Sequence, residues 1–176
     1  MQLTTERFTL RSLNSQELDP EYFEWLKDPE IIQFLTIRGK DFSLDDTKRY
    51  VDSHVAPHEF FFGIFENSDL MIGTHSFRYS RDTNRCAIGG MIGNKEYWGK
   101  KVILETREEL LRYAFEETNC IKVEAGCYSR NLSAVFNFVK QGWTKEGILR
   151  AHRTVSGISE DLILFGMLRR EWNGIR

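Results

Sequence analysis

The chain has 176 residues, of which 41% are hydrophobic and 13% aromatic, and this composition excludes a disordered or fibrous protein. Its 24 Lys and Arg residues nearly balance its 26 Asp and Glu residues, and the net charge of -2 excludes a broadly basic nucleic-acid binder. The N-terminal residues lack the basic and apolar runs of a signal peptide, and no later apolar run approaches the thickness of a bilayer. We therefore expect a cytoplasmic protein with one domain over residues 1–176 and without a membrane or nucleic-acid partner.

The cysteines and histidines do not indicate a disulfide framework or a metal site. The odd number and the absence of CxxC spacing favour reduced, buried thiols at Cys86, Cys120 and Cys127. His54 and His58 are four residues apart, but Pro57 lies between them and no carboxylate set accompanies them. We expect no bound metal.

The N-terminal third predicts one strand followed by two helices. Phe8 and Leu10 alternate with polar neighbours over residues 7–13, which is typical of a half-buried strand. Asn14 or Ser15 can then cap a helix that ends before Asp28-Pro29. A second helix is expected to begin after Ser43, because Asp46 follows three residues later in an aspartate variant of the capping box.

The centre of the chain predicts an antiparallel meander. Three short apolar segments are separated by the turn-forming residues 67–69 and 82–84, and they cover residues 60–66, 71–80 and 85–93.

The following segments predict a parallel crossover and a closing hairpin. Apolar residues recur with helical spacing from about Gly99 to Phe115, and residues 120–128 alternate as a strand does. The strand, helix and strand form a unit whose strands should lie parallel. A helix over 131–141 should end at Gly142, and two last strands should turn at Ser156-Gly157. The expected fold class is α/β (α+β), with a mixed, mostly antiparallel sheet of about seven strands, one parallel pair and about four helices on both sides.

The loop that leaves the first parallel strand is a candidate anion site. Ligands of α/β sheets bind beyond the carboxyl ends of parallel strands, and helix N-termini attract phosphates. Gly99 would let a ligand approach the main chain, while Lys100 and Lys101 add positive charge. The alternative is an ordinary helix start with solvated lysines.

Four segments together resemble the GCN5-related N-acetyltransferase (GNAT) superfamily, in the branch of ribosomal-protein N-terminal and amino-sugar acetyltransferases. They are "ERFTLRSL", "WLKDPEI", "IGGMIGNKEYWGKK" and "NLSAVFNFVKQGWTKEGILRAH". The resemblance implies a GNAT-like fold and direct transfer from acetyl-CoA or another acyl-CoA to an amine, without a metal. It implies that the pantetheine arm lies along the first parallel strand and the pyrophosphate on the helix start.

The resemblance also supplies the expected cofactor contacts. These are Met91, Ile92, Gly93, Trp98, Gly99, Lys100, Lys101, Val102, Ile103, Asn131, Phe138 and Lys140. Asn131 matches the family asparagine that contacts the cofactor, although the residues alone equally indicate a helix cap.

This chain departs from the family pattern at three kinds of position. The loop pattern Gln/Arg-x-x-Gly-x-Gly/Ala is replaced at its three specified places by Trp98, Lys101 and Ile103. Ala87 stands where many relatives carry a glutamate that is a candidate base. The tyrosine or serine often proposed to protonate the leaving thiolate falls on Phe138 or Ala134. The usual acid and base are therefore both absent.

Other side chains could supply this chemistry. His75 has a suitable intrinsic pKa for a base or a substrate ligand, although a structural role is the alternative. Tyr128 and Ser133 could donate a proton, with packing or capping as their alternatives, and Arg78 and Tyr79 could bind an acceptor phosphate.

The missing glutamate favours an acceptor amine of low basicity. A lysine amine, with a pKa of about 10.4, would need strong help to lose its proton, whereas an amine on a sugar ring needs less. We therefore expect a small-molecule acceptor, a nucleotide-linked amino sugar of surface-polysaccharide synthesis. The alternatives are an N-terminal protein acetyltransferase, with an open acidic groove, and a non-catalytic CoA-binding or assembly module. A homodimer is the default expectation for assembly.

Overall fold

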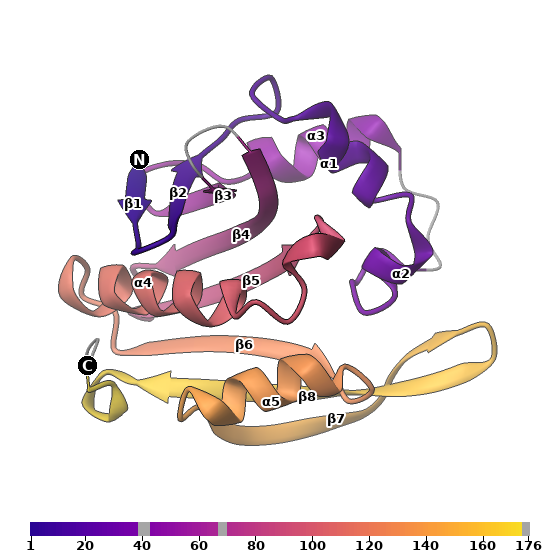
Figure 1. Cartoon of the computed structure of the whole chain (residues 1–176). Coiled ribbons are helices and arrows are strands. Elements are labelled where there is room, and N and C mark those ends of the chain that lie inside the picture. The colour runs from indigo at the N-terminus through magenta and orange to yellow at the C-terminus, as the bar shows by residue number, and fades with distance from the viewer. Residues whose placement is uncertain (39–42, 67–69, 174–176) are drawn as a thin grey trace.

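The computed structural model describes residues 1–38, 43–66 and 70–173. They form one eight-stranded sheet and five α-helices (Figure 1). The strands are β1 (Gln2–Thr4), β2 (Phe8–Ser12), β3 (Glu59–Glu66), β4 (Leu70–Ser80), β5 (Arg85–Ile92), β6 (Lys122–Tyr128), β7 (Thr144–Val155) and β8 (Ile158–Leu168). The helices are α1 (Pro20–Trp25), α2 (Pro29–Ile32), α3 (Leu44–Asp52), α4 (Val102–Glu116) and α5 (Leu132–Lys140). The predicted fold class is confirmed, with β1 as a strand that we did not predict.

The order of the described strands is β1-β2-β3-β4-β5-β6-β8-β7, and among them only β5 and β6 pair in parallel. Their ladder is short, because it joins only Arg85–Ala87 to Lys122–Glu124. β5 otherwise pairs with β4, and β6 pairs with β8. The sheet therefore consists of two antiparallel parts that are joined at one end of the β5–β6 pair.

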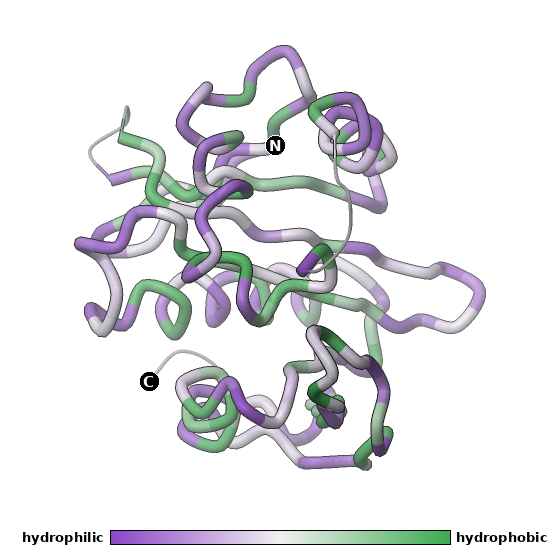
Figure 2. Tube along the Cα trace, turned by 90° about the vertical axis from the view of Figure 1, so that its right-hand side faces the viewer, coloured by the Kyte–Doolittle hydropathy of each residue, from purple (hydrophilic) through white to green (hydrophobic). Residues whose placement is uncertain are grey.

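Helices cover both faces of the sheet, as the pattern of β3 requires. Phe60 and Phe62 belong to the core cluster under α4 and α5, whereas the intervening Phe61 packs with side chains of α1 and α3. Alternation along a strand sends these neighbours to opposite faces. Figure 1 shows α4 and α5 on one face, beside β5 and β8 respectively. Figure 2 shows the chain turned by 90° from this view, with its hydrophobic residues in green and its hydrophilic residues in purple.

Two helix starts differ from the prediction. Asn14 and Ser15 do not cap a helix; α1 begins at Pro20, and the Asp19 carboxylate accepts from the Glu21 amide at 2.8 Å. Asp28-Pro29 does not simply interrupt a helix, because it starts α2 in the same way. Proline suits the first helical position, where its missing N–H is not needed.

The other local predictions are confirmed where the structure describes them. Ser43 and Asp46 form the expected capping box of α3. Gly142, with φ of 78°, follows α5, and the β7–β8 turn has Ser156 and Gly157 at φ of 51° and 75°. The predicted turn at 67–69 lies outside the described residues. Among the described helices, none has the length and apolar character needed to cross a membrane.

Candidate active site

The carboxyl ends of β5 and β6 leave a place for an extended ligand. Beyond Ala87 and Glu124 the two strands no longer pair with each other, although each keeps its antiparallel partner on the other side. The facing edges of residues 88–92 and 125–128 therefore carry backbone groups that no neighbouring strand uses. An extended chain with amide groups can add to such an edge in the manner of a strand.

The first turn of α4 lies at the same end of β5. In the part of the chain that the structure describes, the amides of Val102, Ile103 and Leu104 have no acceptor, and no side chain caps the helix. Unpaired N–H groups and the helix dipole favour an anion there. Gly99 has φ of 76° and no atom within 4 Å of the position a Cβ would take, so its main chain is open to a ligand.

Lys101 has the backbone conformation that the glycine of the family pattern would adopt easily. Its φ is 64° and its ψ is 16°, in the left-handed region, and it is the N-cap of α4. The predicted helix start at Gly99 or Lys100 is therefore two to three residues too early, because the left-handed residue separates the loop from the helix.

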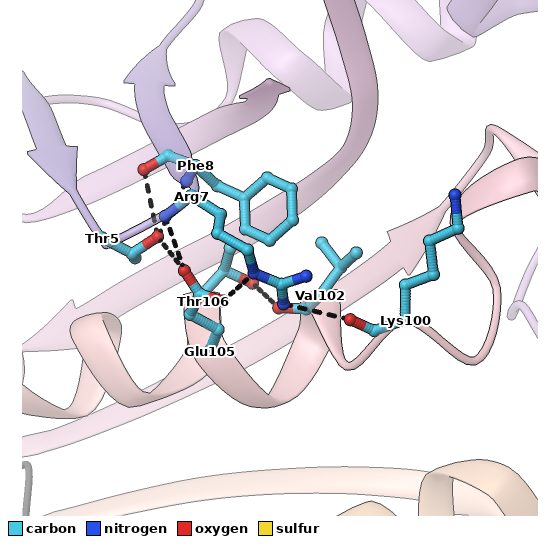
Figure 3. Close-up of polar contacts among 7 residues, drawn as sticks. All are labelled: Thr5, Arg7, Phe8, Lys100, Val102, Glu105 and Thr106. Atoms are coloured by element: carbon cyan, nitrogen blue, oxygen red, sulfur yellow. Dashed lines mark hydrogen bonds and ion pairs between the residues drawn. The ribbon is translucent and has the colours of Figure 1, made fainter. Parts of the chain in front are cut away.

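The loop before α4 is fastened to the first hairpin of the sheet (Figure 3). The Glu105 carboxylate accepts from the Thr5 hydroxyl at 2.6 Å and from the Arg7 side chain at 2.8 Å. The Arg7 guanidinium also donates to the Lys100 carbonyl at 3.0 Å. Burial alone would raise the pKa of Glu105, but the hydrogen bonds from Thr5 and Arg7 hold this pKa below its ordinary value.

Several predicted cofactor residues have roles within the fold. Trp98 is 40% exposed and its indole N–H donates to the Ile92 carbonyl at 2.9 Å. Gly93 is buried against the Trp25 ring, which occupies the space a side chain would need. The Lys100 ammonium lies 4.8 Å from the centre of the Tyr97 ring. Met91 lies half-buried on β5, beside the core cluster under α1 and α3.

The predicted residues on α5 divide into three cases. The Asn131 side-chain oxygen accepts from the Ala134 amide at 3.1 Å, so the helix-cap alternative describes what this oxygen does. Phe138 is buried and stacks on Phe165 with 4.6 Å between ring centres, so it belongs to the core and we withdraw it from the site. Lys140 is exposed near the end of α5.

His75 does not have the environment of a general base. It is 2% exposed, its Nδ1 lies 3.0 Å from the Gly89 carbonyl, and its Nε2 lies 2.8 Å from the Thr106 hydroxyl. Burial lowers the pKa of His75 to about 4, the Gly89 carbonyl opposes this, and the nearby Arg107 adds to it. A neutral ring with both nitrogens engaged has no free lone pair for a substrate, so the structural alternative is correct. The ring also explains Gly90, where a Cβ would collide with it.

Arg78 and Tyr79 lie at the closed end of the β5–β6 pair. They are opposite Ala87 and Cys86 in the β4–β5 ladder, where β5 and β6 are still joined. Arg78 forms an ion pair with Glu59 at 2.8 Å, and the Tyr79 hydroxyl donates to Asn84 at 2.9 Å. The structure therefore does not bring these two residues to the opening.

Tyr128 ends β6 and lines a cavity of about 520 Å³. The other lining residues come from the segment after α2 and from the β7–β8 hairpin: Thr36, Arg38, His152, Arg153, Thr154, Val155 and Ser156. The Arg153 guanidinium stacks 3.5 Å from the centre of the Tyr128 ring. Ser133 is exposed in the first turn of α5. Tyr128 is thus the predicted proton donor that faces a cavity next to the opening.

An arginine cluster beside this cavity was missed from the sequence. The buried Glu160 carboxylate lies 2.5 Å from Arg153, 3.6 Å from Arg38 and 3.9 Å from Arg130. Residues 153 and 160 are equidistant from the predicted turn at Ser156-Gly157, so their pairing could have been found from the sequence. Arg38 is remote in the chain, and nothing in the sequence places it there. The cavity lining among the described residues contains no carboxylate, so it is not the acidic groove expected of the protein-modifying alternative.

Comparison with known proteins gives the family. The model of the acetyltransferase (GNAT) domain matches residues 7–143. The uncharacterised N-acetyltransferase p20 of Bacillus licheniformis is 29% identical over 177 residues, covering 98% of each chain. The probable N-acetyltransferase YjcK of Bacillus subtilis (strain 168) is 32% identical over 157 residues, covering 85% of this chain and 82% of YjcK.

A solved structure shares the fold. It is that of RimL, a ribosomal alpha-N-protein acetyltransferase, in complex with coenzyme A, with a TM-score of 0.82 at 14% identity over 96% of this chain and 98% of that chain. The chain belongs to the GNAT acetyltransferase family. It is an N-acetyltransferase with acetyl-CoA as its donor, and the non-catalytic alternative is set aside.

The residues present fit such a donor. The unpaired amides of α4 and the nearby lysines suit its phosphates, and the open edges of β5 and β6 suit its amide-bearing arm. Acetyl-CoA supplies an activated acyl group as a thioester.

Proposed function

We propose that this enzyme acetylates a primary amine on an anionic acceptor, and that the acceptor binds in the cavity beside Tyr128. The observation that carries the proposal is an excess of positive charge at the cavity: Arg38 and Arg153 line it, Arg130 lies beside it, and among the described residues these three arginines share one ion-paired carboxylate, that of Glu160. Arginine forks suit phosphate and carboxylate groups. The cavity lies at the carboxyl end of β6, where β5 and β6 are no longer paired.

The absence of a side-chain base also limits the acceptor. Ala87 supplies no carboxylate and His75 is enclosed and neutral. An α-amino group has a pKa of about 7.7–8.0, so a large fraction is neutral at pH 8, whereas a lysine amine is almost entirely charged. The amine of a sugar ring is similarly weak as a base. We expect Tyr128 to return the proton that the leaving group needs.

Two acceptors combine these properties. The first is the N-terminus of a protein with acidic residues near its start, and RimL, which has a similar fold, is named for a ribosomal protein substrate. The second is a nucleotide-linked amino sugar, whose phosphates would bind the arginines. The first has support from the names of similar proteins, and the second rests on the charge of the cavity alone.

A panel of amines separates the candidates. We would measure the release of free CoA with two peptides of the same length and first residue, one acidic and one basic, with a nucleotide-linked amino sugar, and with the same sugar without its nucleotide. Higher kcat/KM for either anionic member of a pair supports the proposal. Preference for the basic peptide and for the free sugar would contradict it.

Three substitutions, one of them a control, test where the acceptor binds. Arg38→Ala should raise the KM for the anionic acceptor several-fold, because one cation of the cavity is lost. Arg85→Ala is the control, since Arg85 lines a different cavity at the closed end of the β5–β6 pair. Tyr128→Phe should lower kcat with little change in KM. If Arg38→Ala and Arg85→Ala raised the KM equally, the acceptor would not bind in the cavity beside Tyr128.

The proposed cofactor loop has its own matched pair. Gly99 and Gly142 have φ of 76° and 78°, and neither has an atom within 4 Å of the position that a Cβ would take. Leucine at either position should therefore cost similar stability, about 1 kcal/mol. Only Gly99→Leu should weaken CoA binding in a calorimetric titration. Unchanged CoA binding by Gly99→Leu would leave the loop as an ordinary helix start.

A further inference from the structure

Arg107 of α4 is a buried cation that the proposed function does not yet use. Its exposed fraction is 4%, and its Nε donates to the Gln141 side-chain oxygen at 2.5 Å. Its Nη2 is enclosed and has no hydrogen-bond partner among the residues that the structure describes. Within the described residues, no carboxylate comes within the 4.0 Å of an ion pair with Arg107, although the other buried cation cluster, around Glu160, is paired.

The Arg107 side chain starts from a helix on the N-terminal part of the sheet, but its guanidinium contacts the C-terminal part. α4 packs against β2 and β5, on the N-terminal part of the sheet. The guanidinium carbon, however, lies 4.1 Å from the centre of the Phe138 ring and 5.5 Å from that of Trp143, on the C-terminal part. It also acts electrostatically on His75 beneath α4 and on Cys127 of β6. Arg107 therefore lies beside the opening where β5 and β6 have separated.

An unpaired donor in this position calls for an acceptor. A buried donor without a partner costs about 1–3 kcal/mol, and more when it is charged. The faces of Phe138 and Trp143 offset part of this cost through cation–π contact, but they give the Nη2 hydrogens no lone pair. A ligand carbonyl that enters the opening would supply one.

We propose that Arg107 binds the acetyl-CoA donor, with Nη2 donating to an amide carbonyl of the arm between its phosphates and its thioester. The inference rests on the proposed binding of the donor along α4 and the β5–β6 opening. Ile103, whose amide is expected at the phosphates, precedes Arg107 by four residues, and this spacing is about 6 Å along a helix. The Arg107 guanidinium is held by Gln141 and lies over Phe138, away from the unpaired amides of the first turn, and so it suits the arm.

Binding of two ligands to Arg107→Met tests the proposal. Methionine fills a similar volume without charge. Calorimetric titration should give about tenfold weaker binding of CoA, and unchanged binding of adenosine 3′,5′-bisphosphate, which has no pantetheine arm. The melting temperature should not fall, because a buried unpaired charge has been removed. Arg112→Met is the control on the same helix, because Arg112 pairs with Glu109 at 2.8 Å, and it should bind both ligands normally.

A structural role for Arg107 predicts the reverse pattern, a lower melting temperature with unchanged CoA affinity, and that result would overturn the proposal.

The wild-type protein gives a second measurement that does not depend on the folding of a variant. The Arg107 side-chain N–H resonance, identified by its loss in Arg107→Lys, should shift with CoA and not with the bisphosphate; no shift at CoA saturation also overturns the proposal. If the wild type binds neither ligand, the proposed function fails as well, whereas normal CoA binding by Arg107→Met removes only this inference.

Discussion

Lys101 holds a backbone conformation that side chains with a Cβ rarely adopt. The left-handed region costs such a residue about 1 kcal/mol, and glycine avoids this cost while losing part of the gain through its greater freedom in the unfolded chain. Lys101→Gly should therefore leave the free energy of unfolding unchanged or slightly higher, and CoA affinity equal or tighter. Urea unfolding and calorimetric titration measure the two quantities.

Lys101→Ala is the control for the charge of this residue. It removes the ammonium group but keeps the Cβ and hence the strain, so it should not share the gain in stability. If Lys101→Gly bound CoA much more weakly than Lys101→Ala, the strained backbone itself would be required for binding.

His75 predicts a dependence of stability on pH. Its pKa is about 4 in the folded protein and about 6.5 when unfolded, so its neutral form is favoured by folding. The contribution is complete above about pH 6.5 and is lost as the pH falls towards 4. At pH 5 it amounts to about 2 kcal/mol of lost stability. Urea unfolding of His75→Asn should show a smaller loss between pH 7 and pH 5 than the wild type.

The same variant tests the chemistry. His75→Asn keeps an amide N–H that can donate to the Gly89 carbonyl, and its kcat/KM profile above pH 6 should resemble that of the wild type. Disappearance of an activity-linked pKa near 6 to 7 in the variant would restore His75 as a base.

Individual residues differ in how far the sequence predicts them. The helix-cap interpretation of Asn131 is confirmed, because its side-chain oxygen accepts from the Ala134 amide, whereas its contact with the cofactor stays a prediction. Lys101 was recognisable as the residue in a glycine position. The burial of Arg107 could not be predicted from the sequence. An arginine on a helix is expected to be exposed to solvent, and only the packing of α4 against α5 shows that this one is buried.

At the scale of elements, the hairpin β1–β2 holds the first turn of α4 in place through hydrogen bonds. The Arg7 guanidinium joins the Lys100 carbonyl to the Glu105 carboxylate across the first turn. Arg7→Ala should lower the free energy of unfolding by less than about 1 kcal/mol, because the Arg7 side chain is 44% exposed. It should nevertheless weaken CoA binding about threefold to tenfold, because the loop before α4 loses its anchor.

The exposed pair of Lys27 and Glu24 on the N-terminal helical segment provides the comparison for Arg7→Ala. Lys27→Ala also breaks a surface ion pair, of 2.7 Å, but neither Lys27 nor its partner Glu24 belongs to α4 or to the loop before it, and the variant should leave CoA binding unchanged. Matching losses of CoA affinity in both variants would mean that general surface charge, and not the anchor, is responsible.

The elements that the sequence predicted well are those with a strong period or a complete turn signal. β3, β4 and β5 match their apolar segments closely, and the turn at Ser156-Gly157 fixed the last hairpin. Helix starts were predicted less well, because Asn14, Ser15 and Asp19 are all capable caps and only the proline after Asp19 decides between them. β1 has three residues and gains its place only by pairing with β2.

For the whole molecule, the short β5–β6 ladder predicts which residues a bound donor protects from hydrogen exchange. Three residue pairs join the two parts of the sheet, and a ligand between the strands would add contacts to both. Hydrogen exchange should therefore show that CoA protects residues 88–92 and 125–128 more than β1–β3. Binding to the folded state alone also raises stability by about 2.7 kcal/mol at a hundred times the Kd.

Protection confined to the β7–β8 hairpin would contradict this binding mode.

The single-domain organisation over residues 1–176 and the homodimer stay predictions at this scale.

The three cysteines of the enzyme should react slowly with thiol reagents. Cys86, Cys120 and Cys127 are buried and free, and burial raises the pKa of each thiol, that of Cys127 to about 11. At pH 7.5, roughly one Cys127 in several thousand is a thiolate, the form that reacts with disulfides and electrophiles. The folded protein should thus contribute almost no background to a thiol reagent, and oxidised or electrophilic thiols in its surroundings should leave it unmodified while it handles a thiol-bearing cofactor.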